Sequence, residues 1–313
     1  MMNKLIENYE SKDVINQPLF IKGVLKGATD KGAPYLTITL QDKSGSIHAK
    51  LWNVTNAQED IAVVGKVVFI SGDIIEYNNQ LQLRIRNISE LDQKSVSMDD
   101  FIIKSNVSIS KLKNEINEAI SSIENQNYKN MILKVYEMVG EDFYQYPAAA
   151  RIHHSFLGGL AVHVSSMIKL GNLICNLYPQ LNRDLLISGI LAHDIGKMIE
   201  FNGPITTEYT LEGKLIGHIS IMQGYLMQIA KELNIEDSEE SILLRHMVLS
   251  HHGKLEYGSP ILPMIQEAEV LYLIDNMDAR LNTLETALKQ VKPGSFTPRL
   301  FSLENRAFYK PND

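Results

Sequence analysis

The spacing of apolar residues changes near residue 92 and divides the chain into two kinds of structure. Residues 14–91 contain short runs rich in Val, Ile, Thr and aromatic residues, broken by Gly, Asn and Asp, which is typical of β-strands. From residue 110 onward the apolar residues recur every three to four positions, as they do on the buried face of a helix. The sequence therefore predicts a multidomain protein in which a β domain precedes an all-α domain.

The β region has the element order of an OB-fold, a five-stranded barrel. Residues 80–88 alternate strictly, with Leu81, Leu83 and Ile85 on one face, as in a half-buried antiparallel strand. A short helix is predicted within residues 54–64. The five predicted strands are residues 19–26, 35–41, 46–52, 66–77 and 80–88. The resulting order, β-β-β-α-β-β, indicates an OB-fold barrel.

The rest of the chain is divided by composition. Seven helices are predicted, at residues 111–123, 128–139, 156–177, 183–200, 215–233, 238–250 and 265–290. The polar stretch 92–100 is typical of a linker, and the tail contains Pro293, Gly294 and Pro298. We expect an N-terminal extension (1–13), the barrel (14–91), a linker with connecting helices (92–150), a helical domain with the chemistry (151–290) and an irregular tail (291–313).

Charge and composition limit the classes of function. The net charge is −7 and the sequence pI is about 5.8, which argues against a protein that coats nucleic acid by bulk charge. Residues 14–91 nevertheless hold eight basic and seven acidic residues, so the excess acidity lies outside the barrel. The single cysteine, Cys175, fits a reducing compartment. We found no signal peptide and no uninterrupted apolar run of about 18 residues, so we expect a cytoplasmic protein outside any membrane.

The histidines are concentrated in one part of the chain. Eight of the nine lie between residues 153 and 252. The strongest local pattern is His-Asp-Ile-Gly-Lys at residues 193–197. Neighbouring His193 and Asp194 on a helix can offer a nitrogen and an oxygen to one metal ion, and Lys197 would lie above the same face. A single buried histidine is more often a hydrogen-bonded core residue than a ligand, but the group is harder to explain in that way.

The other candidate ligands lie in separate helices. They are His163, His218, His251 and Asp275, with His252 as an additional candidate. Asp275 stands in the apolar run Leu-Tyr-Leu-Ile-Asp, where a buried carboxylate would be costly without a cation or a proton. These positions together predict a divalent metal site in the helical domain.

The order His163, His193-Asp194, Asp275 resembles the HD superfamily of metal-dependent phosphohydrolases, and HDIGK is its most recognisable signature. The segment 151–160 is similar to the one that precedes the first ligand in a bacterial subgroup. With an OB-fold in front, nearly the whole chain resembles the YhaM family of 3′ to 5′ exoribonucleases. No Gly-Tyr-Pro sequence follows the HD motif, which argues against a cyclic-dinucleotide phosphodiesterase.

The resemblance implies one or two divalent ions, with Mn²⁺ favoured and Co²⁺, Fe²⁺ or Zn²⁺ also compatible with nitrogen and oxygen ligands. With two ions, Asp194 would bridge a first site (His163, His193, Asp275) and a second site (His218, His251 and His252). Such a centre activates water for in-line attack on phosphorus and releases a nucleoside 5′-monophosphate. Asp194 and Lys197 are the predicted catalytic residues. Asp194 would bridge the two ions, and Lys197 would neutralise charge on the phosphate.

Substrate contacts are predicted in two places. Arg151, His153 and His154 precede the first ligand and could contact the terminal phosphate or ribose, although helix capping and surface packing explain them equally well. In the barrel the candidates are aromatic and basic strand residues, namely Tyr35, Lys50, Trp52, Arg84 and Arg86. Core packing of the aromatic rings and ordinary solvation of the charges are the alternatives.

Three functions follow from these observations. The first is a 3′ to 5′ exoribonuclease that hydrolyses single-stranded RNA, with single-stranded DNA as an open second substrate. The second is an HD-type phosphohydrolase of small nucleotides in which the barrel is a regulatory module. The third is a non-catalytic single-strand-binding or replication-associated factor with a structural metal. A homo-oligomer is compatible with all three.

Overall fold

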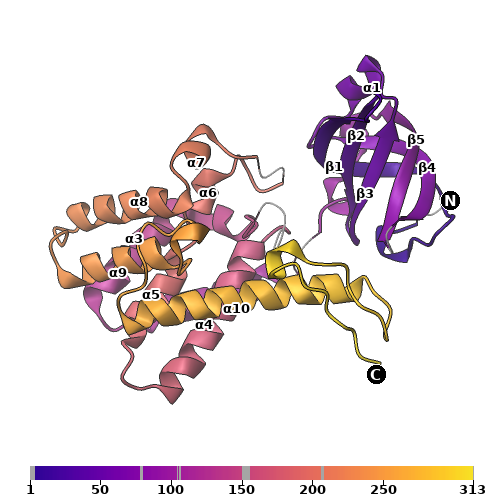
Figure 1. Cartoon of the computed structure of the whole chain (residues 1–313). Coiled ribbons are helices and arrows are strands. Elements are labelled where there is room, and N and C mark those ends of the chain that lie inside the picture. Colours follow the sequence, from indigo (N-terminus) through magenta and orange to yellow (C-terminus); the bar gives the residue numbers. More distant parts are fainter. Residues whose placement is uncertain are drawn as a thin grey trace. The chain divides into compact units, whose positions relative to one another are not determined.

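The structure is a computed structural model that describes residues 4–77, 80–103, 105, 107–149, 156–205 and 208–312. The chain divides into two compact units. One unit combines Met1–Lys104 with Leu288–Asp313, and the other is Ser105–Ala287. Figure 1 shows the barrel in the indigo and purple part of the chain and the helices in the magenta to orange part.

The first unit contains the predicted five-stranded barrel. Its strands are β1 (Val14–Ala28), β2 (Pro34–Asp42), β3 (Gly45–Trp52), β4 (Val67–Tyr77) and β5 (Gln80–Glu90), with α1 (Asn56–Ile61) between β3 and β4. They close in the order β1-β2-β3-β5-β4, and β3 pairs with β5 in parallel while the other pairs are antiparallel. The predicted fold class and the short helix are confirmed.

The prediction of strict alternation along β5 is only partly right. Leu83 and Ile85 are buried, but Leu81 is 39% exposed near the end of the strand. After Ile85 the register against β4 shifts, and Ile88 takes the next core position. The partner strand causes this shift, because a Cβ on Gly72 would lie 2.4 Å from the Arg84 carbonyl oxygen. Glycine therefore permits a β-bulge that the sequence of β5 alone does not reveal.

The polar stretch after β5, expected to be a linker, packs on the barrel instead. It forms two 3₁₀ turns, Gln93–Ser95 and Met98–Asp100. Phe101 follows them and is buried with Phe20 and Val67 in a small apolar cluster. The Gln41 side chain donates a hydrogen bond of 2.9 Å to the Phe101 carbonyl oxygen. Buried Phe101, together with hydrogen bonds between the Gln93 side chain and the Val67 backbone, thus holds a largely polar segment against the strands.

The second unit is helical, as predicted. Its helices are α2 (Ile109–Ser121), α3 (Gln126–Val139), α4 (Gly159–Leu177), α5 (Arg183–Ala192), α6 (Lys197–Glu200), α7 (Leu211–Leu215), α8 (His218–Glu232), α9 (Glu239–Ser250) and α10 (Gln266–Lys289), which ends just beyond the unit. They surround one apolar core. The short helix α7 was not expected from the sequence. Helices α4 and α5 pack against each other, and Figure 1 shows α10 as the long orange-to-yellow helix.

The helix predicted at residues 183–200 is interrupted at the HDIG motif. α5 ends at Ala192, a turn follows, and α6 begins at Lys197. Within the turn the Lys197 amide donates to the Asp194 carbonyl, a bond three residues apart rather than four. A Cβ on Gly196 would lie 2.2 Å from the His218 carbonyl oxygen. Gly196 therefore packs closely against the start of α8, and the turn brings His193 and Asp194 next to it.

One described helix, α4, is long and apolar enough to cross a membrane by length and composition. Half of its most apolar window is buried inside the fold, and buried His163 lies on it. Helix α4 is thus built as a core helix of the helical unit. The tail after α10 has two isolated β-bridges, Phe296 with Tyr309 and Leu300 with Arg306.

Candidate metal centre

Two groups of ligand side chains meet at one carboxylate in the helical unit. In each group the candidate ligand atoms all lie within 4.8 Å of one another. Asp194 belongs to both groups. The first group also contains His163 and His193, and the second contains His218, His251 and His252. These residues come from α4, α8 and the turns that follow α5 and α9, so the fold assembles them from distant parts of the chain.

The first group is fully buried. The Nε2 atoms of His163 and His193 are 3.4 Å apart, and His193 Nε2 lies 3.4 Å from Asp194 Oδ2. Asp275 on α10 lies beside this group, with its Oδ1 atom 3.2 Å from His163 Nε2. Two nitrogens and the Asp194 carboxylate thus converge on one position, and the Asp275 carboxylate contacts it through His163.

The second group gathers around the other oxygen of Asp194. Its Oδ1 atom is 3.5 Å from His218 Nε2 and 3.6 Å from His251 Nε2. The ring of His252 lies 4.3 Å from the ring of His251. Asp194 Oδ1, His218 Nε2 and His251 Nε2 are all buried without a hydrogen-bond partner among the described residues. Buried polar atoms are rarely left in this state, so three of them facing one point fit the ligands of a metal ion.

The second nitrogen of each ring decides which nitrogen faces the centre. His193 Nδ1 lies 2.8 Å from the Ile190 carbonyl, and His251 Nδ1 lies 2.7 Å from the Val248 carbonyl. His252 Nδ1 lies 2.7 Å from another carbonyl, that of Tyr257. Because a carbonyl oxygen can only accept, each Nδ1 carries the proton and donates it. Each Nε2 therefore has a lone pair available for a metal.

At the two remaining histidines, His163 and His218, the Nδ1 atom faces a carboxylate instead of a backbone carbonyl. Asp278 Oδ2 lies 2.7 Å from His163 Nδ1, and Glu200 Oε1 lies 3.2 Å from His218 Nδ1. Glu200 also accepts from the His218 backbone amide at 3.1 Å. A carboxylate behind an imidazole orients the ring and increases its basicity as a ligand. From the sequence, Asp278 could either support a ligand, because it lies three residues after Asp275 on the same helix face, or be a solvated surface residue. The sequence analysis missed Glu200, although its place in the apolar run Met-Ile-Glu-Phe is a signal of burial with a partner.

Burial sets the protonation of the second group. It lowers the pKa of His218 and of His251. Burial and the neighbouring His251 lower the pKa of His252 to about 4. These three rings are therefore neutral near pH 7, the form that binds a metal.

In the first group, nearby charges outweigh the effect of burial on the pKa values. Burial lowers the pKa of His163, but the Asp275 and Asp278 carboxylates outweigh it and raise the pKa to about 10. Burial disfavours the charged form of Asp194, yet Lys197 and His193 hold its pKa well below the usual range. The carboxylates near His163 thus attract a positive charge, and a metal ion can supply it in place of the proton.

The donor set fits a divalent transition metal. Imidazole nitrogens with carboxylate oxygens suit Mn²⁺, Fe²⁺, Co²⁺ and Zn²⁺ better than Mg²⁺, which prefers oxygen alone. Lys197 lies beside this set, with Nζ 2.6 Å from Asp194 Oδ2. Lys197 lies three residues after Asp194, and both side chains are buried. They therefore form a fixed ion pair at the edge of the site.

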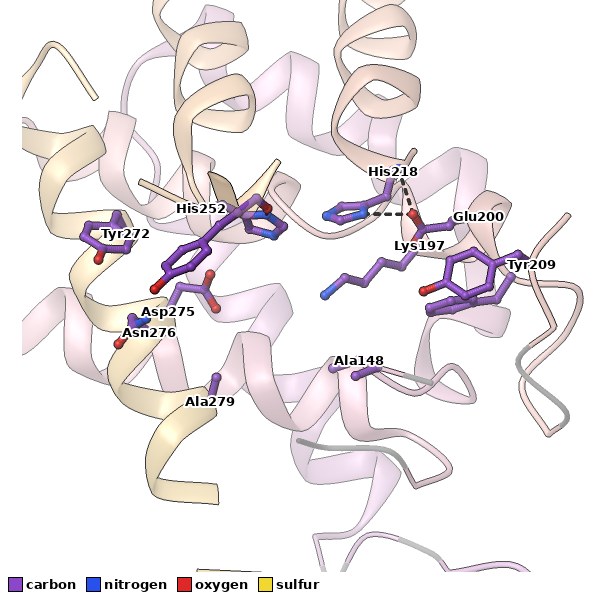
Figure 2. A pocket seen from close by; sticks show the side chains of 13 residues that line it. Ala148, Lys197, Glu200, Tyr209, His218, His252, Tyr272, Asp275, Asn276 and Ala279 are labelled. Carbon is purple, nitrogen blue, oxygen red and sulfur yellow. Dashed lines mark hydrogen bonds and ion pairs between the residues drawn. The ribbon is translucent and has the colours of Figure 1, made fainter. Parts of the chain in front are cut away.

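A pocket of about 440 Å³ opens onto these residues. Lys197, His218, His252 and Asp275 line it, and Figure 2 shows the Lys197 ammonium pointing into it. Phosphate oxygens in this pocket would meet both the ammonium and the ligand clusters. The arrangement can therefore bind a phosphodiester and supply an activated water to it.

Four other basic or histidine residues of the helical domain are not part of either ligand group that the structure describes. Arg151, His153 and His154 lie outside the described residues. His246 belongs to neither ligand group, and its Nε2 accepts a 3.1 Å hydrogen bond from the Met264 amide. His246 is thus a structural residue of the kind expected for a lone histidine.

Three of the five barrel candidates form one surface group. Tyr35 and Trp52 are cross-strand partners whose rings lie 4.9 Å apart. Lys50 Nζ lies 4.4 Å from the centre of the Tyr35 ring and 5.9 Å from that of Trp52. We call Tyr35, Lys50 and Trp52 the barrel aromatic group. Trp52 is 46% exposed, so a ring face is available there.

The two arginines lie on the adjoining strand. Arg84 pairs with Lys50 across β3 and β5. Arg84 Nη2 lies 3.1 Å from Asp73 Oδ2, and Arg86 Nε donates to the same oxygen at 2.7 Å. Both arginines are therefore partly neutralised by one carboxylate, whose pKa they lower, chiefly through the Arg86 hydrogen bond.

Comparison with known proteins agrees with both units. Residues 20–91 match the family described as the OB-fold nucleic acid binding domain, and residues 160–280 match the HD domain family. The chain is 46% identical to the 3′-5′ exoribonuclease YhaM of Geobacillus sp. (strain WCH70), over 99% of this chain and 96% of that protein. It is 44% identical to the protein of the same name from Bacillus subtilis (strain 168), over 99% of each chain.

These relatives are matched along nearly their whole length, and the match spans both the barrel and the helical unit of this chain. The chain belongs to the YhaM family of 3′-5′ exoribonucleases.

Proposed function

We propose that this protein is a metal-dependent exoribonuclease that degrades single-stranded RNA from the 3′ end and releases nucleoside 5′-monophosphates. Family membership over the whole chain supports the activity. The observation that carries the metal dependence is the group of three buried atoms, on Asp194, His218 and His251, that face one another without hydrogen-bond partners among the described residues.

The two ligand groups would hold two ions with Asp194 between them. His163, His193 and Asp275 would complete the first site, and His218, His251 and His252 the second. We propose Mn²⁺ as the metal, because the mixed nitrogen and oxygen donors suit it and the family resemblance favours it. When bound, the ions lower the pKa of a shared water and polarise the phosphate.

The side chains around the ligands have separate tasks. Lys197 holds Asp194 and presents its ammonium to the pocket, where it would neutralise charge that develops on the phosphate oxygens. Asp278 and Glu200 orient the imidazoles of His163 and His218. Asp194 and Lys197 are therefore the residues we assign to catalysis.

The barrel would bind the strand upstream of the cleaved end. The barrel aromatic group offers an exposed ring next to an ammonium, which suits stacked bases and a phosphate backbone. Arg84 and Arg86 would extend this surface, and Arg151, His153 and His154 are proposed to contact the terminal nucleotide. We propose a cytoplasmic location, and single-stranded DNA as a second substrate.

The two alternative functions are less well supported. A phosphohydrolase of small nucleotides would use the same metal centre, and a non-catalytic binding factor would use the barrel. Relatives named as 3′-5′ exoribonucleases match both units together, which favours neither alternative.

The test uses the full chain and a 5′-labelled single-stranded RNA with added Mn²⁺. We expect a ladder of products that shorten by one nucleotide, together with nucleoside 5′-monophosphates. His193→Ala removes a ligand of the first group and should abolish the ladder. His246→Ala is the matched control, because His246 is in the same unit and in neither group. Internal cleavage by the wild type, or an unchanged ladder from His193→Ala, would contradict the proposal.

A further inference from the structure

The pocket beside the ligand groups has walls that take no part in metal binding. Tyr209 lies on one side, and Tyr272 and Asn276 lie on the other (Figure 2). The latter two are four residues apart on α10 and share the helix face of Asp275. A group bound at Lys197 and Asp275 would therefore have aromatic and polar neighbours on both sides.

Tyr209 is exposed but held in place. Its ring lies 5.1 Å from the ring of Phe201 at an interplanar angle of 70°, and the two residues form a β-bridge. Phe201 is buried, with 3% of its surface exposed, while Tyr209 is 47% exposed. The buried ring thus braces a tyrosine whose own ring can be covered by a ligand. Stacking on such a ring stabilises any of the four bases.

Asn276 supplies an unused amide. It lines the pocket half-buried, and its side chain makes no hydrogen bond with another described residue. An amide offers two donors and one acceptor, which can pair with the hydroxyl groups of a sugar. The wall on α10 therefore has capacity for a polar ligand next to Asp275.

The size of the pocket matches one nucleotide. Its volume is about 440 Å³. Pockets of about 300 to 1,000 Å³ hold one small organic molecule. A nucleoside monophosphate belongs to that class, and it has the three chemical parts that the walls can recognise: phosphate, sugar and base.

We propose that this pocket binds the 3′-terminal nucleoside of the substrate, with its base stacked on Tyr209 and its sugar hydrogen-bonded to Asn276. The assignment rests on the proposed function, since that function places the terminal phosphodiester at Lys197 and the ligand groups. Tyr209 then recognises the base, and Asn276 recognises the sugar.

The test measures binding by calorimetry, using the full chain with Mn²⁺ and two probes, adenosine 5′-monophosphate and ribose 5-phosphate. The wild type should bind the nucleotide about five- to a hundredfold more tightly, the range that one stacked base supports. Tyr209→Leu should bind the nucleotide and ribose 5-phosphate with nearly equal affinity, whereas Tyr209→Phe should keep the preference for the nucleotide. Asn276→Leu should weaken both probes equally, by about two- to tenfold, since both contain the sugar.

Tyr178→Leu is the matched control. Tyr178 is 49% exposed and does not line the pocket, so the affinity ratio should stay at the wild-type value. Equal affinities of the wild type for the two probes, or a ratio that survives Tyr209→Leu, would overturn the proposal. Release of 5′-monophosphates from RNA by the same preparation tests the proposed function separately, so the two failures can be told apart.

Discussion

The polar side chains proposed to function differ between the two units: those on the barrel are paired at the surface, and those in the helical unit are buried. On the barrel, Lys50 donates to Thr37 at 2.5 Å, and one aspartate holds two arginines at the surface. In the helical unit, by contrast, Asp194 and the histidines around it are buried, and three of their atoms face each other without hydrogen bonds among the described residues. We therefore expect the barrel to change the affinity for RNA, and the helical unit to depend on bound metal ions for activity.

The largest effect should come from the carboxylate shared by both ligand groups. Asp194→Asn removes the negative charge from both sites, so we expect RNA hydrolysis to fall at least about 10³-fold, as when one member of a catalytic unit is lost. Activity and bound Mn²⁺ should be measured on the same sample. Asp237→Asn is the control, because Asp237 belongs to neither group. Retention of both ions by Asp194→Asn would contradict the shared site.

The carboxylates behind the histidines should have a smaller effect. Asp278→Asn weakens the support of His163, and Glu200→Gln weakens that of His218. Loss of such a partner typically lowers metal affinity about 10- to 100-fold. Titration with Mn²⁺ should show one weakened site in each variant and two unchanged sites in the control Glu212→Gln, whose side chain is exposed on α7. Two equally weakened sites in Asp278→Asn would argue against separate groups.

The strands could be predicted because their alternation is local. Leu83 and Ile85 face the core as expected, but the bulge opposite Gly72 depends on the neighbouring strand and could not be read from β5. The burial of Phe101 could not be predicted either, because one aromatic residue beside a polar stretch does not form a repeating apolar pattern.

The centre of the site could also be anticipated, since the candidate ligands are chemically rare in apolar helices. The break in the helix at the HDIG motif could not, because the reason is the contact between Gly196 and the start of α8. Tyr209, on the pocket wall, lies after a turn and has no helical spacing to mark it. Residues that act through tertiary contact therefore need the structure.

On the barrel, loss of an exposed ring should weaken RNA binding without affecting the metal. Trp52→Leu removes the most exposed ring of the barrel aromatic group. We expect KM for a long single-stranded RNA to rise about 5- to 20-fold, within the range of one stacked base, with kcat and Mn²⁺ content unchanged. Phe301→Leu, at a residue 94% exposed in the tail, is the control. A lower kcat with the same KM would place Trp52 in a different role.

The smallest effect should come from freeing the two arginines. Asp73→Asn releases Arg84 and Arg86 from their common partner, so binding of RNA at low salt should tighten by a few fold. The salt dependence should become steeper, by about 0.7 in slope for each additional phosphate that the arginines neutralise. Asp13→Asn, which frees Lys4 elsewhere on the barrel, should leave the slope unchanged. Weaker binding by Asp73→Asn would show that the arginines need Asp73 for their position.

The most direct test of the account is the number of metal ions bound per chain. Protein prepared without metal should bind two Mn²⁺ ions in the wild type. His163→Ala should leave one ion, in the group of His218, His251 and His252, and His251→Ala should leave one in the other group. A wild type that binds a single ion, still retained in both variants, would contradict two sites joined at Asp194.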